Sequence, residues 1–85
     1  MKVFCYTVKD PEGVHALPAG DLVKLANTFS CSITAEGNHN MVDAKHLFGI
    51  MSLGVKHGQT LTIKCEGPDE NEAAAALEKY MIDNL

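Results

Sequence analysis

His15 is the residue whose place in the chain best suits covalent chemistry. It lies in the segment Gly13-Val14-His15-Ala16-Leu17-Pro18-Ala19, after a glycine turn and just before an amphipathic helix. The first N–H groups of a helix have no partner inside the helix, and the helix dipole places roughly half a positive charge there. An anion is stabilised at such a point, so a ring nitrogen of His15 could accept and hold a phosphoryl group. Taken alone, however, the segment favours a surface histidine at a helix start with no chemical role.

Length and charge exclude several functional classes. Eighty-five residues form one small domain, expected to span residues 1–85, and such a domain buries only about 60–65% of the surface that its unfolded chain exposes. It has no room for a deep catalytic cleft, so its chemistry should take place at the surface. A net charge of −4, with seven lysines and no arginine, argues against nucleic-acid binding. The start at Met1 and the clean end near Leu85 lead us to expect a free-standing domain rather than part of a fusion.

The N-terminal segment and the cysteines indicate a cytoplasmic protein. Residues 1–8 are too few and too quickly polar to form a signal peptide or a membrane span. Cys5, Cys31 and Cys65 are odd in number, far apart and without metal-type spacing, which fits reduced core thiols better than a disulfide framework. We expect a cytoplasmic monomer without membrane insertion, and without a bound metal or cofactor.

Hydrophobic periodicity predicts four strands and three helices in the order β-α-β-β-α-β-α. Alternating or continuous apolar residues indicate strands, and apolar residues at helical spacing indicate helices. The predicted strands are 2–8, 32–36, 41–44 and 59–66, and the predicted helices are 16–29, 45–53 and 70–83. Apolar strand faces covered by helices predict an α+β open-faced sandwich, in which a four-stranded antiparallel sheet carries three helices on one face.

Three local features add further expectations. The strand at 2–8 is apolar on both faces, which favours a strand that is central or covered on both sides. Asp69 followed by Glu72 predicts a capping pair at the start of the last helix. Gly20 inside a helix costs about 1 kcal/mol relative to alanine, which suggests close approach by a partner at that position.

Three motifs together resemble one known family. They are the segment 13–19 around His15, the run Gly49-Ile50-Met51-Ser52-Leu53-Gly54-Val55, and the turn Gly67-Pro68-Asp69-Glu70. The motifs and the spacing between them resemble the HPr family, the histidine-containing phosphocarriers of the bacterial phosphoenolpyruvate-dependent sugar phosphotransferase system. The resemblance extends from about residue 2 to residue 83. The resemblance implies the same four-stranded, three-helix fold. It also implies a carrier with a covalent intermediate rather than a free-standing enzyme with a small-molecule substrate.

The resemblance assigns roles to particular residues. It implies that His15 is phosphorylated on a ring nitrogen, with enzyme I as the donor and the IIA unit of a sugar permease as the acceptor. The N–H groups of Ala16 and Leu17 would bind the phosphoryl oxygens. In the family, the helix after His15 and the short helix that follows the hairpin form one docking surface for both partners. The residues implied at this surface are Leu17, Gly20, Lys24, Leu47, Phe48 and Met51.

The apolar residues of the short helix have a second interpretation. Leu47, Phe48 and Met51 could simply cap the core. Because residues at i, i+1 and i+4 cannot all face inward on so short a helix, at least one should be exposed. Aromatic and methionine side chains are enriched at adaptable interfaces, so we favour docking, with Phe48 as the strongest candidate.

Two positions depart from the family pattern. The family usually has at position 17 an arginine that can pair with phosphoryl oxygens, whereas this chain has Leu17 and no arginine. We therefore expect His15 to be phosphorylated more slowly, or to exchange its phosphoryl group with a narrower set of partners. Many Gram-positive members have at position 46 a serine that a dedicated kinase modifies, and His46 cannot form that ester. The alternative function is an HPr-like regulatory paralogue that docks on a transcription factor or an enzyme with weak or no phosphotransfer.

The remaining candidate groups have simpler explanations. His39, His46 and His57 fall in predicted loops or helix starts without paired metal-ligand spacing, so we expect solvated side chains. Cys31 has no neighbouring base in the sequence, which argues against a nucleophilic role. The acidic run 69–72 is better explained by charge complementarity at a helix N-terminus than by calcium binding.

Overall fold

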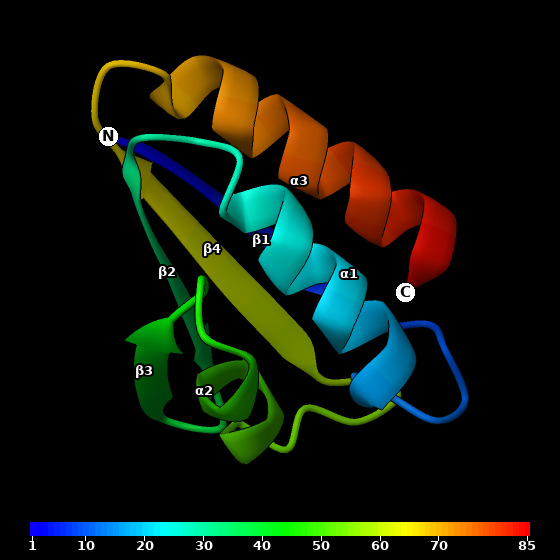
Figure 1. Cartoon of the computed structure of the whole chain (residues 1–85). Coiled ribbons are helices and arrows are strands. Elements are labelled where there is room, and N and C mark those ends of the chain that lie inside the picture. The colour runs from blue at the N-terminus through cyan, green and yellow to red at the C-terminus, as the bar shows by residue number, and fades with distance from the viewer.

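The chain forms an antiparallel sheet covered by helices. The computed structural model describes residues 1–85 (Figure 1). The strands are β1 (Lys2–Thr7), β2 (Ser32–Gly37), β3 (Asn40–Asp43) and β4 (Thr60–Glu66). The helices are α1 (Ala16–Ala26), α2 (Leu47–Ser52) and α3 (Glu70–Asn84). The strand order across the sheet is β1-β4-β2-β3, with every neighbouring pair antiparallel.

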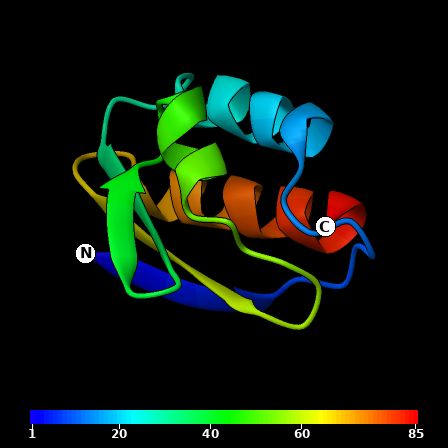
Figure 2. The same ribbon diagram turned by 90° about the horizontal axis from the view of Figure 1, so that it is seen from below.

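All three helices lie on the same face of the sheet (Figure 2). The predicted α+β open-faced sandwich is therefore confirmed. Alternation along β4 supplies the centre of the core, since Leu61, Ile63 and Cys65 are fully buried. They share one hydrophobic cluster with residues of α1 and α3. Each fully buried leucine or isoleucine side chain stabilises the fold by about 1.5–3 kcal/mol. None of the helices has the length and apolarity that a bilayer crossing requires.

Helices α1 and α2 are shorter than their predicted ranges because polar groups end them. The Asn27 amide donates to Val23 O at 2.9 Å and to Lys45 O at 3.0 Å, which fixes the chain as it leaves α1. The Lys45 N–H donates to the Asp43 carboxylate at 2.9 Å, so the chain between β3 and α2 is not helical. Phe29, beyond the end of α1, still packs against the core.

The prediction that strand 2–8 would be central or covered on both sides is wrong. β1 is an edge strand paired only with β4, and Val3 and Cys5 are exposed on the open face of the sheet. A chain of this size has no second layer for that face, and exposed apolar side chains are common on folded proteins. The expected core thiols are therefore Cys31 and Cys65 alone. Burial raises the pKa of Cys31 to about 11.

The predicted capping pair of Asp69 and Glu72 is also wrong. Asp69 occupies the N-cap position of α3 but makes no side-chain capping bond. Its carboxylate instead accepts the N–H groups of Ser30 and Cys31 at 2.8 and 2.9 Å. The bond from Ser30 is the main cause that lowers the pKa of Asp69 below its usual value. Asp69 therefore joins the start of α3 to the segment between α1 and β2.

Candidate functional site

The loop between β1 and α1 carries His15 and is held at both ends. Near its start, the Asp10 N–H donates to Leu85 O at 2.7 Å. Near its end, the Val14 N–H donates to Val55 O at 2.9 Å. Inside the loop, the Gly13 N–H donates to Asp10 O at 2.9 Å and closes a turn. The backbone that presents His15 is therefore fixed by bonds to two distant parts of the chain.

Gly13 allows this loop to lie directly against the segment that precedes β4. Its φ of +70° lies in the left-handed region that favours glycine. A Cβ atom at this position would lie 2.7 Å from Lys56 Cα and 2.7 Å from Val55 O, both of which are backbone atoms. A larger residue at position 13 would push the loop outward, and His15 with it.

His15 is the N-cap residue of α1, and its ring does not take part in capping. The residue is extended, with φ −97° and ψ 177°, and its carbonyl accepts the Ala19 N–H at 3.0 Å. The N–H groups of Ala16 and Leu17 have no acceptor in the chain, and Pro18 has no N–H to satisfy. The His15 side chain is 35% exposed. An accessible ring and two free backbone donors thus lie at the same end of α1.

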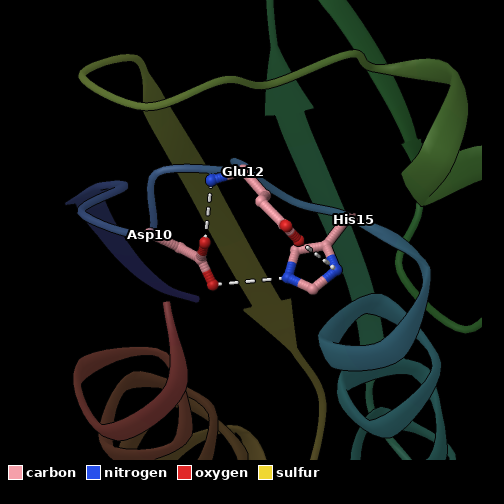
Figure 3. A group of neighbouring side chains, drawn as sticks. All are labelled: Asp10, Glu12 and His15. Carbon is pink, nitrogen blue, oxygen red and sulfur yellow. Dashed lines mark hydrogen bonds and ion pairs between the residues drawn. The ribbon is translucent and has the colours of Figure 1, made fainter.

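Two carboxylates flank the His15 ring, one at each nitrogen (Figure 3). Asp10 Oδ2 lies 3.3 Å from Nε2 in a hydrogen bond. Glu12 Oε2 lies 3.4 Å from Nδ1 and forms an ion pair with the ring when the ring is protonated. The two carboxylates differ in exposure, since 22% of the Asp10 side chain and 73% of the Glu12 side chain are open to solvent.

Asp10 is also fixed from its other oxygen. Its Oδ1 accepts the Glu12 N–H at 2.8 Å. This backbone bond is the main cause that lowers the pKa of Asp10, with the His15 side chain contributing in the same direction. Asp10 is therefore a carboxylate at neutral pH, with one oxygen bound to the backbone and the other facing Nε2.

A shallow hollow opens beside His15 between α1 and α3. It is lined by Asp10, Leu17, Pro18, Asp21, Tyr80 and Asn84 in addition to His15. The Tyr80 hydroxyl donates to Pro18 O at 2.9 Å, which ties the first turn of α1 to α3. Burial is the main cause that raises the pKa of Tyr80. The charged groups of this hollow are acidic, so an incoming anion meets favourable charge only at the start of α1.

The residues at position 17 and on α2 present apolar side chains to solvent. Leu17 is 75% exposed and Phe48 is 87% exposed, while Leu47 and Met51 are each 38% exposed. The expectation that at least one α2 residue would be exposed is confirmed. Ile50 is the buried residue that anchors α2 to the core. Because α1 and α2 are in contact, these side chains belong to neighbouring helices (Figure 2).

Gly20 and Lys24 complete the set of predicted α1 residues. Nothing lies within 4 Å of the position that a Cβ would take at Gly20, so packing within the chain does not require glycine there. Lys24 is exposed in the last turn of α1. At 1.5 Å per residue it lies about 12 Å along the helix from Ala16, so it does not replace an arginine next to His15.

The other histidines lie apart from this arrangement. His46 precedes α2, and its Nε2 lies 3.5 Å from Asp43 Oδ2 on the surface. His39 lies in the hairpin turn with a φ of 68°, and His57 is exposed before β4. Ser52 donates to Gly49 O at 2.6 Å, a bond within α2 itself. The side chains of His39, His46 and His57 are exposed, as expected.

One group of side chains has the composition of a metal site. Asp10, Glu12 and His15 offer ligand atoms that lie within 4.8 Å of one another. The two carboxylates face different nitrogens of the ring, however (Figure 3). A single ion would therefore have to reorient the ring or one carboxylate before all three groups could bind it.

The two carboxylates beside His15 were not predicted from the sequence. Neither Asp10 nor Glu12 was among the predicted site residues. Their signal is local, because a turn of this kind brings side chains three and five positions before the N-cap residue back toward it. The contact of Tyr80 with Pro18 carried no such signal, since the two residues are far apart in the sequence.

The fold and the site define a small open-faced α+β domain with an accessible histidine at a helix start. Comparison with known proteins places it in a family. Residues 3–83 match the PTS-HPr family, described as the PTS HPr component phosphorylation site. The chain is 38% identical to the phosphocarrier protein HPr of Mycoplasma genitalium over 90 residues, which cover 99% of this chain and 97% of that protein. The chain belongs to the HPr family.

Solved structures agree with this assignment. An HPr structure from Thermoanaerobacter tengcongensis superposes with a TM-score of 0.92 at 40% identity, covering 98% of this chain and 93% of that one. The catabolite repression protein Crh of Bacillus subtilis, described as a domain-swapped dimer, superposes with a TM-score of 0.77 at 34% identity. That match covers 94% of this chain and 92% of Crh.

Proposed function

We propose that this chain takes a phosphoryl group from enzyme I and passes it to the IIA unit of a sugar permease through His15, in the cytoplasm. Membership of the HPr family supports the phosphocarrier function. The observation that carries the choice of residue is the partly exposed His15 ring at the start of α1, beside two N–H groups without an acceptor.

The chemistry needs little from side chains other than the imidazole. A neutral ring nitrogen forms a bond to phosphorus, the bond from phosphorus to the donor breaks, and its electron pair stays on the donor atom. The N–H groups of Ala16 and Leu17 bind the phosphoryl oxygens during and after this transfer. No guanidinium is present to add a bidentate contact, so the backbone donors and the helix dipole supply the favourable charge.

The docking surface of this proposal lies on α1 and α2. It consists of Leu17, Gly20, Lys24, Leu47, Phe48 and Met51. Apolar side chains that are exposed at a site of transient binding gain from burial against a partner, and aromatic residues contribute most. The same surface serves the donor and the acceptor, because the donor must deliver the phosphoryl group to the His15 ring and the acceptor must take it from the same ring.

A second function is supported by one feature, the exposed leucine at position 17. It would suit an HPr-like regulatory protein that docks on a transcription factor or enzyme and transfers phosphate weakly. The substitution Leu17→Arg separates the two functions. A regulatory protein that has lost efficient transfer should gain transfer rate strongly, whereas a working carrier that relies on backbone donors should change little.

The relay itself is the experiment that tests the proposal. Purified protein is added to phosphoenolpyruvate, enzyme I and a IIA protein, and phosphorylation of the IIA protein is measured over time. We expect IIA phosphorylation to require this chain and to disappear with His15→Ala. The variants His46→Ala and His57→Ala, which remove other exposed rings, should retain it. A IIA signal that persists with His15→Ala would refute the choice of residue.

A further inference from the structure

Asp10 and Glu12 contact His15 in unequal ways, and this inequality bears on which ring nitrogen reacts. A neutral imidazole carries one proton, so one nitrogen donates while the other keeps a lone pair. Only the nitrogen with the lone pair can bond to phosphorus. The group that holds the ring proton therefore determines the nucleophile.

Asp10 is the better holder of that proton. Its contact with Nε2 has hydrogen-bond geometry at 3.3 Å, and its second oxygen is bound by the Glu12 N–H. Its own backbone N–H is bound to Leu85 O. The carboxylate is thus oriented before the ring meets it, and little conformational entropy is lost on forming the contact.

Glu12 is the weaker partner. Its carboxylate lies 3.4 Å from Nδ1 without hydrogen-bond geometry, and no other group in the chain holds that side chain. It is largely exposed, and exposed ion pairs contribute little because water screens them and a long side chain must be ordered. Water can replace Glu12 at Nδ1, which frees that side of the ring.

We propose that Asp10 is a positioning residue that keeps the ring proton of His15 on Nε2 and presents the Nδ1 lone pair to the phosphoryl donor. This inference rests on the proposed phosphotransfer through His15. When the Nδ1–P bond forms and the bond from phosphorus to the donor breaks, Nε2 keeps its proton and the ring becomes cationic. The Asp10 carboxylate then faces that positive charge and stabilises the phosphorylated ring.

The substitution Asp10→Asn tests this role sharply because of how the residue is held. The Glu12 N–H donates to Oδ1, and an amide NH₂ group cannot accept that bond, so the oxygen of the substituted amide takes the place of Oδ1. The atom that faces Nε2 is then an NH₂ group, which donates rather than accepts. The variant should move the ring proton to Nδ1 and remove the nucleophile. Where a carboxylate orients a catalytic histidine, this kind of exchange lowers the rate by as much as about 10⁴-fold.

The first measurement is the tautomer of the neutral His15 ring. It is read from the ¹⁵N chemical shifts of the two ring nitrogens, at a pH high enough for the ring to be neutral. Wild type and Glu12→Gln should carry the proton on Nε2, whereas Asp10→Asn should carry it on Nδ1. A purely structural role of Asp10 would not invert the tautomer. An Asp10→Asn protein that keeps the proton on Nε2 would overturn the proposal.

The second measurement is the initial rate of phosphorylation by enzyme I. Asp10→Asn should be slower by about tenfold or more, a loss of at least about 1.4 kcal/mol of transition-state stabilisation. Glu12→Gln and Glu72→Gln remove the same charge, the latter in the first turn of α3, at the opposite end of that helix from Asn84 and the hollow beside His15, and should not show this loss. Equal losses in all three variants would refute the inference. If wild type itself takes no phosphoryl group, the proposed function fails, while the tautomer measurement still decides the role of Asp10.

Discussion

Replacing Gly13 by alanine should damage the site more than the same change at a glycine of similar backbone conformation. Gly13 and Gly58 have φ values of +70° and +86°. Alanine in that region costs about 1–2 kcal/mol at either position. At Gly13 the new Cβ would also lie 2.7 Å from two backbone atoms, whereas nothing lies within 4 Å at Gly58.

The extra contact at Gly13 cannot be relieved by rotating a side chain, because Lys56 Cα and Val55 O belong to the main chain. Overpacking of this kind costs about 1–3 kcal/mol more. We therefore expect Gly13→Ala to lose about 2–5 kcal/mol in free energy of unfolding, against about 1–2 kcal/mol for Gly58→Ala. Because the loop carries His15, the substitution should also move the ring away from the two free N–H groups.

Urea unfolding of both variants measures the stability difference, and initial phosphorylation rates at a temperature where both are folded measure the displacement of the ring. Gly58→Ala should be phosphorylated at the wild-type rate and Gly13→Ala much more slowly. Similar losses of stability in the two variants would refute the steric argument. A folded Gly13→Ala protein with a normal rate would refute the link between the loop and the site.

Individual contacts lead to four further predictions. Gly20→Ala should raise the free energy of unfolding by about 0.5–1 kcal/mol, since alanine suits a helix better; it should also raise KM for enzyme I, and an unchanged KM would remove Gly20 from the docking surface. Phe48→Ala should change the free energy of unfolding by less than about 0.5 kcal/mol yet raise KM for both partners about tenfold. Ile82→Ala, which removes an exposed apolar residue of α3, is the control and should leave both KM values unchanged. Asp69 has a lowered pKa in the folded protein, so its carboxylate stabilises the fold at pH values above the usual carboxyl pKa near 3.8, and this stabilisation is lost as the pH falls through the pKa of the folded state. Urea unfolding should show that Asp69→Asn is less stable than wild type at pH 7 but nearly equal to it at strongly acidic pH. A difference in stability that does not change with pH would contradict this. A kinase that modifies a serine at position 46 should leave this protein unmodified because of His46, as phosphopeptide mapping after incubation with ATP would show.

The core could be predicted from the sequence because its signals are periodic. The alternation of Leu61, Ile63 and Cys65 identified the buried face of β4, and the helical spacing of Leu22 and Ala26 identified the face of α1 that packs against it. The position of β1 could not be predicted in this way. An apolar run has the same composition in a central strand and in an edge strand that lies next to solvent, and strand order depends on contacts between distant segments.

The site was predictable to the extent that it depends on local backbone structure. A histidine directly before a helix with free N–H groups follows from the glycine turn and Pro18. Asp69 was assigned wrongly because an acidic residue at a helix start with a glutamate three positions later usually marks a cap. Its real partners, the N–H groups of Ser30 and Cys31, come from a distant loop. Sequence patterns near Asp69 contain no information about that loop.

The most direct test of the account is to locate the phosphoryl group on the protein. The chain contains four histidines, and each of them has a ring nitrogen that can carry a phosphoryl group. After incubation with phosphoenolpyruvate and enzyme I, peptides should be separated at neutral or basic pH and analysed by mass spectrometry. We predict one acid-labile phosphate per chain, on His15. A phosphate on another residue, or none on the wild-type protein, would contradict the central claim.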